Sequence, residues 1–395
     1  MGLTRNERLR TSISLYINYL VHGMAIVILA QNMTMLSKQW GVTDAGVSFV
    51  ISSLGIGRLI VLYISGVLSD KYGRRVFVQL GILTYIPFFI GITFSPNIYV
   101  GYFFGILAGM ANSFLDSGTY PALMELYPEN PTTANILIKA FASIGELILP
   151  ILVTVIEYYH VWFGASFMVC SIIFAINFFV ISGSKFPKLS TVVKEKSDGI
   201  KAKLSSKDKI NAIALTLYGY VSMSTFYLVS QWLTKYGQAV LNMNTAHARY
   251  LVSIYSVGSI AGVIASTILT GLHFRSTYLM FASTLTSFIT LVVVSTVLVQ
   301  PVLFIGSFVI GFTAAGGVMQ VGLTIMSELF PDRKGFITGV YYTAGSLSSF
   351  TIPIVTGYLY KISVQSIMLF DCFIAAVGVL ISVVILLNTR RVKLV

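Results

Sequence analysis

The chain has 395 residues, of which 56% are hydrophobic and only 10% are charged, and its mean hydropathy is +0.84. Soluble domains carry about 25% charged residues, so these values exclude an ordinary soluble enzyme, a disordered chain, a coiled coil and a disulfide scaffold. A membrane-spanning helix needs about 20 residues, so the chain is long enough for twelve. We therefore expect an all-α membrane protein.

The formal net charge of +12 would indicate nucleic-acid binding only if Lys and Arg clustered on a folded soluble face, and we find no such domain. Cys170 and Cys372 lie in apolar runs and predict neither a disulfide nor a metal site. No HExxH, CxxC or P-loop pattern occurs. We expect no enzymatic activity, no metal, no cofactor and no nucleic-acid partner.

Apolar runs separated by short polar segments predict twelve spans in chain order. They lie at about 11–31, 44–66, 76–94, 97–125, 135–158, 162–183, 209–237, 246–271, 277–297, 300–329, 336–360 and 364–387. The first run lacks a small-residue cleavage site, so we expect it to be retained as a span.

A lysine-rich segment, 184–208, separates six spans from six. We expect an N-terminal bundle over 1–183, a basic linker over 184–208, and a C-terminal bundle over 209–395. If the N-terminus is cytoplasmic, twenty of the 26 Lys and Arg residues fall on that side and four on the other. The positive-inside rule therefore places both termini in the cytoplasm.

The two halves share short sequence segments at one spacing. Glu125-Leu126-Tyr127-Pro128-Glu129 follows the fourth span, and Glu328-Leu329-Phe330-Pro331-Asp332 follows the tenth, 203 residues later. Pro150-Ile151 and Pro353-Ile354 are separated by the same number of residues. Internal duplication of this kind is typical of transporters.

The loop between the second and third spans reads Gly66-Val67-Leu68-Ser69-Asp70-Lys71-Tyr72-Gly73-Arg74-Arg75. It resembles the signature loop of the major facilitator superfamily at every defining position. The resemblance implies two pseudo-symmetric six-helix bundles, with the first, fourth, seventh and tenth helices around a central cavity. Drug-proton antiporters of this family typically carry G-P-x-x-G-G in the fifth span, where this chain has Gly145-Glu146-Leu147-Ile148-Leu149-Pro150.

This loop is predicted to form a conformational latch. Gly66 would permit close helix approach, Asp70 would pair with a neighbouring cation, and Gly73 would let the chain turn before Arg74 and Arg75. Salt bridges formed there would break when the halves rock apart. The alternative is a basic turn that only sets topology.

Ionisable groups near the middle of a bilayer are costly and are functional candidates. Counted along their helices, Arg58, Asp116 and Glu146 lie in the middle third of their spans, and His22 lies at a similar depth. In the helix arrangement that the resemblance implies, Arg58 and Asp116 lie on neighbouring helices, and they differ in depth by about 4.5 Å, so we expect them to pair. Lys139 is two turns from Glu146, so we expect Glu146 to lack an obvious cationic partner.

A desolvated carboxylate without a partner can bind and release protons near neutral pH. We therefore predict proton coupling by Glu146, with Asp116 and His22 as further candidates. Arg58 would hold Asp116 or bind a substrate carboxylate, and Tyr19 and His22 would line the substrate site. The alternative is a buried salt bridge that only stabilises the first half.

The predicted substrate-binding residues of the second half are neutral: Tyr218, Ser222, Gln320 and Tyr342. Asp371, in the last span, is expected to face a neighbouring helix or water. Aromatic and hydroxyl groups suit a modest polar organic solute.

These patterns favour a secondary active transporter that works by alternating access. We expect proton symport driven by a proton gradient, and no cofactor. The substrate would be a sugar, a carboxylate or an aromatic metabolite. The alternative is a proton-coupled exporter of amphipathic compounds or drugs. We expect a multi-pass monomer in the plasma membrane, with a small-molecule substrate and membrane lipids as its partners.

Overall fold

The structure is a computed structural model that describes residues 4–129, 131–186, 206–272, 274–316, 318–329 and 334–389. These ranges contain helices and no strand, so the predicted all-α class is confirmed. The first half comprises α1 (Arg5–Gln31), α2 (Met33–Trp40), α3 (Asp44–Tyr72), α4 (Arg74–Phe94), α5 (Ile98–Leu126), α6 (Pro131–Tyr158) and α7 (Ala165–Ser182). The second comprises α8 (Ser206–Leu241), α9 (Thr245–Gly271), α10 (Ser276–Thr296), α11 (Gln300–Ile310), η1 (Gly311–Ala315), α12 (Val318–Leu329), α13 (Lys334–Tyr360) and α14 (Val364–Thr389).

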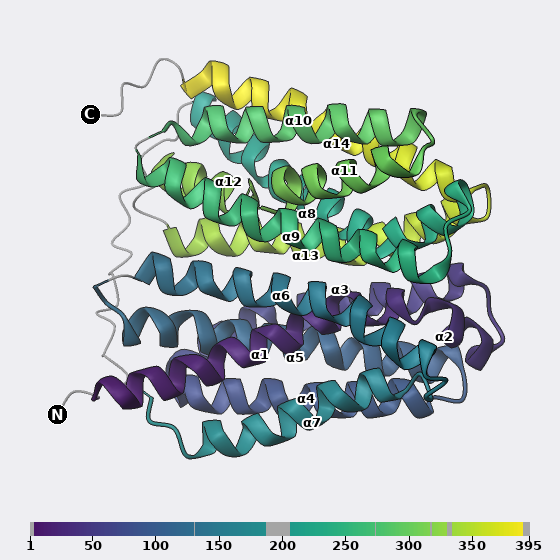
Figure 1. The fold of residues 1–395 in the computed structure, drawn as a ribbon. Helices are drawn as coiled ribbons and strands as arrows, with labels where there is room; N and C mark the ends of the chain where they lie inside the picture. The colour runs from purple at the N-terminus through teal and green to yellow at the C-terminus, as the bar shows by residue number, and fades with distance from the viewer. Residues whose placement is uncertain are drawn as a thin grey trace.

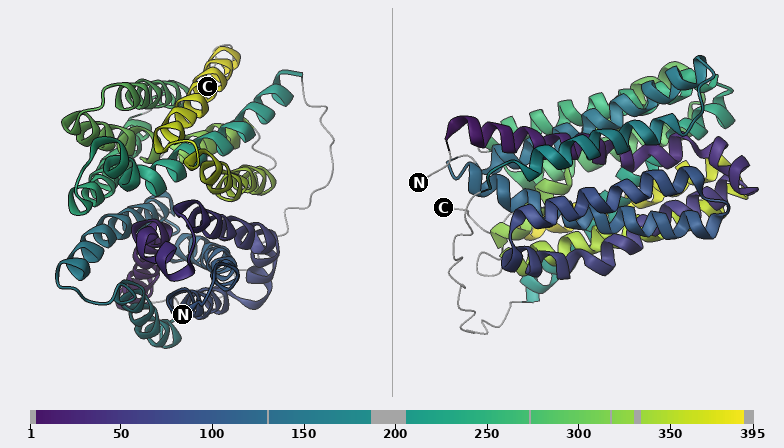
Figure 2. Two further views of the ribbon diagram at one scale, coloured as in Figure 1. Left: turned by 90° about the vertical axis from the view of Figure 1, so that its right-hand side faces the viewer. Right: turned by 90° about the horizontal axis from the view of Figure 1, so that it is seen from below.

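The long helices run roughly parallel to one axis and gather into two groups, α1–α7 and α8–α14 (Figures 1 and 2). Both chain ends lie at the same end of the molecule, which we name the terminal end. The opposite end is named the far end. Residues 187–205 of the predicted linker are outside the described residues.

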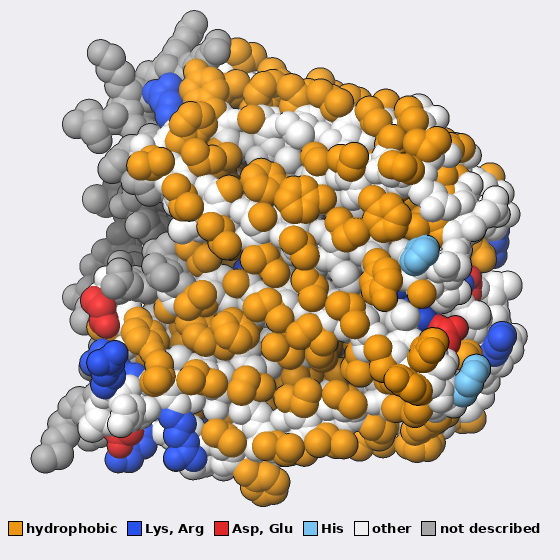
Figure 3. Space-filling view, viewed as in Figure 1, with side chains coloured by type: hydrophobic (Ala, Val, Ile, Leu, Met, Phe, Trp, Pro, Cys, Tyr) orange, Lys and Arg blue, Asp and Glu red, His pale blue; other side chains and the backbone are white. Residues whose placement is uncertain are grey.

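Ten of the described helices are long and apolar enough to cross a membrane. The other two predicted spans are α13 and the tenth, which is divided into α11, η1 and α12. Hydrophobic side chains cover the middle of the visible face, and charged side chains lie mostly toward its two ends (Figure 3). This distribution matches a bilayer core between two aqueous surfaces.

Small residues allow the helices of the first half to pack closely. A Cβ added at Gly23 of α1 would lie 1.9 Å from the Ala142 carbonyl oxygen of α6, and one added at Gly109 of α5 would lie 1.9 Å from the Leu54 carbonyl oxygen of α3. Lipid chains are as apolar as the helix faces, so close van der Waals contact holds such helices together.

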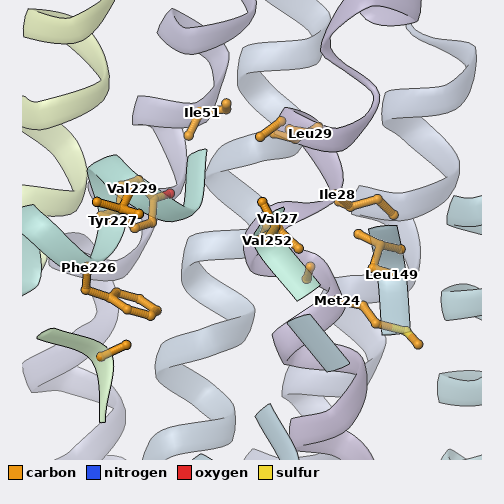
Figure 4. Packing of buried hydrophobic residues seen from close by; sticks show 14 of the residues in the cluster. Met24, Val27, Ile28, Leu29, Ile51, Leu149, Phe226, Tyr227, Val229 and Val252 are labelled. Atoms are coloured by element: carbon orange, nitrogen blue, oxygen red, sulfur yellow. The ribbon is translucent and has the colours of Figure 1, made fainter. Parts of the chain in front are cut away.

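One buried apolar cluster extends across both halves. The close view shows Val27 and Ile51 of the first half together with Phe226, Tyr227 and Val229 of α8, all of which belong to this cluster (Figure 4). The same cluster includes residues of α9, among them Val252, and of α6, among them Leu149. The interface between the halves is therefore a packed core over part of its length.

Polar contacts at the far end join the two halves, and we name this set the far-end seam. Its members are Gln31 with Thr234 (3.1 Å), Lys235 with Asp44 (2.8 Å), Tyr360 with Asp44 (3.2 Å), Ser48 with the Pro353 carbonyl (2.7 Å), and Arg249 with Glu157. Ser143 and Ser259 continue the contact between α6 and α9 toward the middle, at 3.1 Å. The halves are therefore held together on the side away from the termini.

Two features of the elements differ from the sequence predictions. The loop after the first span contains the short helix α2, which ends at Gly41 in a left-handed conformation with φ of 64°. A Cβ at Gly66 would meet no atom within 4 Å. The prediction that Gly66 permits close helix approach is therefore wrong, because this face of α3 points into open space.

Candidate functional site

Arg58, Asp116 and Tyr19 meet where α3, α5 and α1 converge. Arg58 Nη2 lies 3.2 Å from Asp116 Oδ2, and the Tyr19 hydroxyl donates to Asp116 Oδ1 at 2.5 Å. The predicted pairing of Arg58 with Asp116 is confirmed. Their side chains are 15% and 18% exposed, so both charges remain partly accessible at the centre of the molecule.

Aromatic hydroxyl groups from both halves surround this pair. Tyr342 of α13 and Tyr120 of α5 lie within electrostatic range of Arg58 and Asp116, and Tyr227 of α8 lies within range of Arg58. The buried Tyr227 hydroxyl has no hydrogen-bond partner among the described residues. Tyrosines of both halves therefore lie near the charged pair, and Tyr342 is one of them.

His22 lies one turn beyond Tyr19 on α1, and its ring contacts that of Tyr19 edge to face, with centroids 5.5 Å apart. Its Nδ1 is 2.6 Å from the hydroxyl of Tyr85 on α4. The Tyr85 ring stacks on Phe89 and Phe174. His22 is therefore placed behind Tyr19 and supports its position.

Glu146 is fully buried on α6, and Lys139 Nζ lies 3.8 Å from its Oε1. The prediction that Glu146 lacks a cationic partner is wrong, because two helical turns bring Lys139 to the same face and its long side chain spans the gap. Neither Glu146 oxygen has a hydrogen bond among the described residues. The Lys139 ammonium lies 4.3 Å from the centre of the Phe226 ring of α8, so this pair reaches the second half.

Glu146 is positioned where α6 meets α9. Ser143, three residues before it, contacts Ser259, and Ser253 donates to the carbonyl of Leu147 at 2.9 Å. Tyr255 of α9 lies within electrostatic range of Glu146. The charge on Glu146 is therefore held at a surface that must separate if the halves move apart.

Other predicted substrate residues of the second half lie away from Arg58. The Tyr218 hydroxyl contacts Thr284 Oγ1 of α10 at 2.6 Å, and Tyr218 and Ser222 line a small cavity inside the second half. Gln320 belongs to α12, but its side chain is outside the described residues. The sequence placed these residues on plausible spans but did not determine which face of each helix they occupy.

The loop between α3 and α4 forms a charged cluster within the first half. Arg74 pairs with Asp70, and its Nε lies 3.2 Å from Glu125 Oε1 of α5. Arg74 is buried, whereas Arg75, the next residue of α4, is partly exposed. The predicted salt bridges of this loop are therefore formed, but those described join α3, α4 and α5 within the first half, so the expectation that they break when the halves rock apart is wrong for these contacts.

Gly73 enables this arrangement through its backbone. It separates α3 from α4 with φ of 99°, a conformation that residues with a Cβ rarely adopt. Arg74 begins α4 directly after this turn. The predicted role of Gly73 in turning the chain is confirmed.

Sequence reasoning missed three of these partners. Glu125 was noted only as part of the repeated segment, and Tyr85 and Tyr120 were not singled out. All three lie on spans that the sequence predicts, but nothing in the local pattern shows which residues face the charges. Among the described residues, no group of three or more His, Cys, Asp or Glu side chains could hold a metal ion.

Comparison with known proteins identifies the family of this chain. The family model described as Major Facilitator Superfamily matches residues 15–299 and 246–394. The inner membrane transport protein YdiM of Escherichia coli is 48% identical over 394 residues, which cover 98% of this chain and 96% of that protein.

Two solved structures share the fold at 14% sequence identity. The nucleoside transporter NupG gives a TM-score of 0.76 and covers 97% of this chain and 99% of its own. A D-xylose-proton symporter also gives 0.76, with coverage of 95% and 96%. This likeness confirms twelve transmembrane helices in two six-helix bundles. The sequence, the fold and the relatives agree that the chain is a transporter rather than an enzyme, and it belongs to the major facilitator superfamily.

Proposed function

We propose that this chain is a proton-coupled symporter that moves a small polar organic metabolite across the plasma membrane by alternating access. The proposal rests on the ion pair of Arg58 with Asp116, which is partly accessible. Tyr19 donates a hydrogen bond to Asp116, and tyrosines of both halves lie near the pair. A guanidinium group binds carboxylates and other planar oxygen groups through parallel hydrogen bonds. The surrounding aromatic rings supply an apolar wall for the rest of a small solute.

Competition for Arg58 gives this site a means of coupling. Asp116 holds the guanidinium while it is ionised, and a proton on Asp116 removes most of that attraction. Arg58 then becomes available to an oxygen group of the substrate. Proton binding and substrate binding would favour each other for this reason.

Protonation of Glu146 would couple proton binding to the movement of the two halves. It is fully buried at the contact between α6 and α9 and is paired at 3.8 Å with Lys139. A buried charge that lacks hydrogen bonds is costly. Protonation would change the stability of this contact, and separation of the halves would let the carboxylate be hydrated.

The orientation follows from the Lys and Arg count of twenty against four. With both termini and the linker in the cytoplasm, the far-end seam would close the outer side. The inner membrane relative supports location in the plasma membrane. The central site lies between the two halves of one chain, so we propose that the monomer is the working unit.

Transport by the purified chain in lipid vesicles tests this function. Sugars, carboxylates, aromatic metabolites and cationic dyes are first screened for a rise in the Tm of the wild type. Compounds that bind are then tested for uptake driven by a pH gradient. Glu146→Gln should abolish accumulation against a concentration gradient while retaining substrate exchange, because the amide keeps the shape and loses the titratable proton.

Glu129→Gln is the matched control, because this acid is exposed at the terminal end, where it pairs with Arg8. It should accumulate substrate like the wild type. Unchanged accumulation by Glu146→Gln would rule out its coupling role. Binding of cationic dyes with no binding of polar metabolites would replace the proposed substrate class with amphipathic compounds.

A further inference from the structure

Asp371 on α14 is a buried carboxylate that the coupling step described above does not use. Its side chain is 0% exposed, and Oδ1 accepts a hydrogen bond from Thr225 of α8 at 2.8 Å. Oδ2 has no hydrogen-bond partner among the described residues. Of the two expected surroundings of Asp371, a neighbouring helix or water, the structure shows a helix, α8.

The helices around Asp371 offer it no cation. α14 packs against α8, α10 and α13. α10 contains no charged residue, and α13 contains only Lys334, its first residue, at the terminal end. The basic residues of α8 lie near its two ends, and Lys235 among them pairs with Asp44 in the far-end seam.

The titratable groups near Asp371 are also uncharged at neutral pH. Tyr255 of α9 and the neighbouring Cys372 lie within its electrostatic range. Tyrosine and cysteine ionise above neutral pH when unperturbed. An ionised Asp371 would therefore be a buried charge with a single hydroxyl donor, which is a costly state.

A small cavity of about 20 Å³, whose exposed wall is mostly apolar, lies on the other side of Thr225 from this acid. Its polar walls are Tyr218, Ser222, Thr225, Thr284, Ser287 and Thr313. Thr225 therefore contacts both the cavity and Asp371. Ser287 is 3% exposed, and its hydroxyl has no hydrogen-bond partner among the described residues. The volume of this cavity is sufficient for one water molecule, for which the Ser287 hydroxyl would be a partner.

The cavity wall also includes the π-helical turn η1, through Thr313. Such turns occur frequently at functional sites. Thr313 donates back to the Val309 carbonyl at 2.8 Å. A carboxyl group with one unpartnered oxygen, a small cavity with the unpartnered Ser287 hydroxyl in its wall, and a local break in the helix thus occur together in the described part of the second half.

We propose that Asp371 is a reversible proton-binding site of the second half. The proton binds to Oδ2, while Oδ1 keeps its hydrogen bond from Thr225. Water that enters the adjoining cavity brings the proton as hydronium and takes it up again on release. The site does not depend on the proposed function, although its use in symport rests on that function.

Infrared spectroscopy of the full-length protein in lipid bilayers tests the site without a substrate. A protonated carboxyl group has a carbonyl stretching band that a carboxylate lacks. The wild type should show this band at neutral pH, and Asp371→Asn should lose it. Asp44→Asn is the matched control, because Asp44 is ion-paired with Lys235, and the band should remain in this variant. It should also remain in Glu146→Gln, which separates this site from the proposed coupling residue.

Thr225→Val provides a second variant if Asp371→Asn does not fold. It retains the acid and removes the hydroxyl, so the band should persist and shift to higher frequency because the carbonyl loses its hydrogen bond. A spectrum with no band assignable to Asp371 between acidic and neutral pH would overturn the proposal. A rise in Tm with sodium chloride over choline chloride that Asp371→Asn abolishes would also overturn it, and would identify a sodium site.

Discussion

Arg58 lies where three helices of the first half meet and where tyrosines of the second half approach. Its guanidinium contacts Asp116, whose other oxygen is held by Tyr19. Arg58 Nε is buried without a hydrogen-bond partner among the described residues. Asp116 therefore satisfies only part of the donor capacity of Arg58.

Removing one member of this pair should cost more stability than removing both. Arg58→Ala leaves Asp116 in a largely buried place without its cation, which should lower the free energy of unfolding by about 3 kcal/mol. The double variant Arg58→Ala/Asp116→Asn should recover at least about 1 kcal/mol of that loss. Thermal unfolding of the four proteins in one detergent measures the cycle.

Tyr19→Phe serves as the comparison, because it removes one hydrogen bond and leaves both charges in place. Its cost should be about 1 kcal/mol. Additive effects of Arg58→Ala and Asp116→Asn would contradict an energetic link between the two side chains. Substrate binding by these variants then shows whether Arg58 is needed for anionic solutes more than for neutral ones.

At the scale of the helices, close packing decides which charges can meet. α3 and α5 approach so closely at Gly109 that an added Cβ would lie 1.9 Å from the Leu54 carbonyl and 2.6 Å from the Arg58 amide nitrogen. This contact sets the spacing of the two helices that carry Arg58 and Asp116. Gly66, on the same helix α3, has open space instead.

Two glycine-to-alanine substitutions, one at a close helix contact and one at an open position, show whether the contact determines the loss of stability. Gly109→Ala should destabilise the protein by about 1 to 3 kcal/mol, because backbone atoms must move to admit the methyl group. Gly66→Ala should change stability by no more than about 0.5 kcal/mol. Thermal unfolding compares the stabilities of the two variants. Equal losses of stability would show that α3 is packed against a neighbour at Gly66 as well.

At the scale of the whole molecule, the charged contacts around Arg74 differ in their task from those of the far-end seam. Arg74, Asp70 and Glu125 bind α3, α4 and α5 to one another within the first half. The far-end seam instead joins the two halves, chiefly through Lys235, which contacts Asp44. Opening the far end requires the seam to break, whereas the cluster around Arg74 can move as one unit.

Lys235→Ala should shift the population toward conformations that are open at the far end. A cysteine at Gln31, buried in the seam, should then react several-fold faster with a membrane-impermeant thiol reagent added to intact cells. Lys361→Ala is the control, because Lys361 lies over the ring of Tyr358 in its own half. Its rate should match that of the parent.

The same measurement tests the orientation of the chain. Labelling only in inverted membrane vesicles would place the far end in the cytoplasm and reverse the proposed topology. An equal rate in Lys235→Ala and the parent would show that this contact does not hold the far end closed.

The sequence by itself determined most of the spans, the resemblance to the family and the depth of the central charges. These properties depend on runs of apolar residues, on a local motif and on distance along a helix. Depth along the helix predicted the pairing of Arg58 with Asp116 only together with the family resemblance, which implies that their two spans are neighbours. The charge at the loop ends similarly predicts an orientation from local composition.

Only the tertiary structure decided which face of each helix points where. In a membrane helix the faces toward lipid and toward protein are both apolar, so hydrophobic periodicity carries little information on rotation. For this reason the sequence misjudged Gly66 and missed the contact of Lys139 with Glu146. The break in the tenth span and the turn of Tyr218 toward Thr284 likewise depend on packing between distant helices. The burial of Asp371 beside Thr225 has the same origin, since a residue of α14 meets one of α8 only when the second half is assembled.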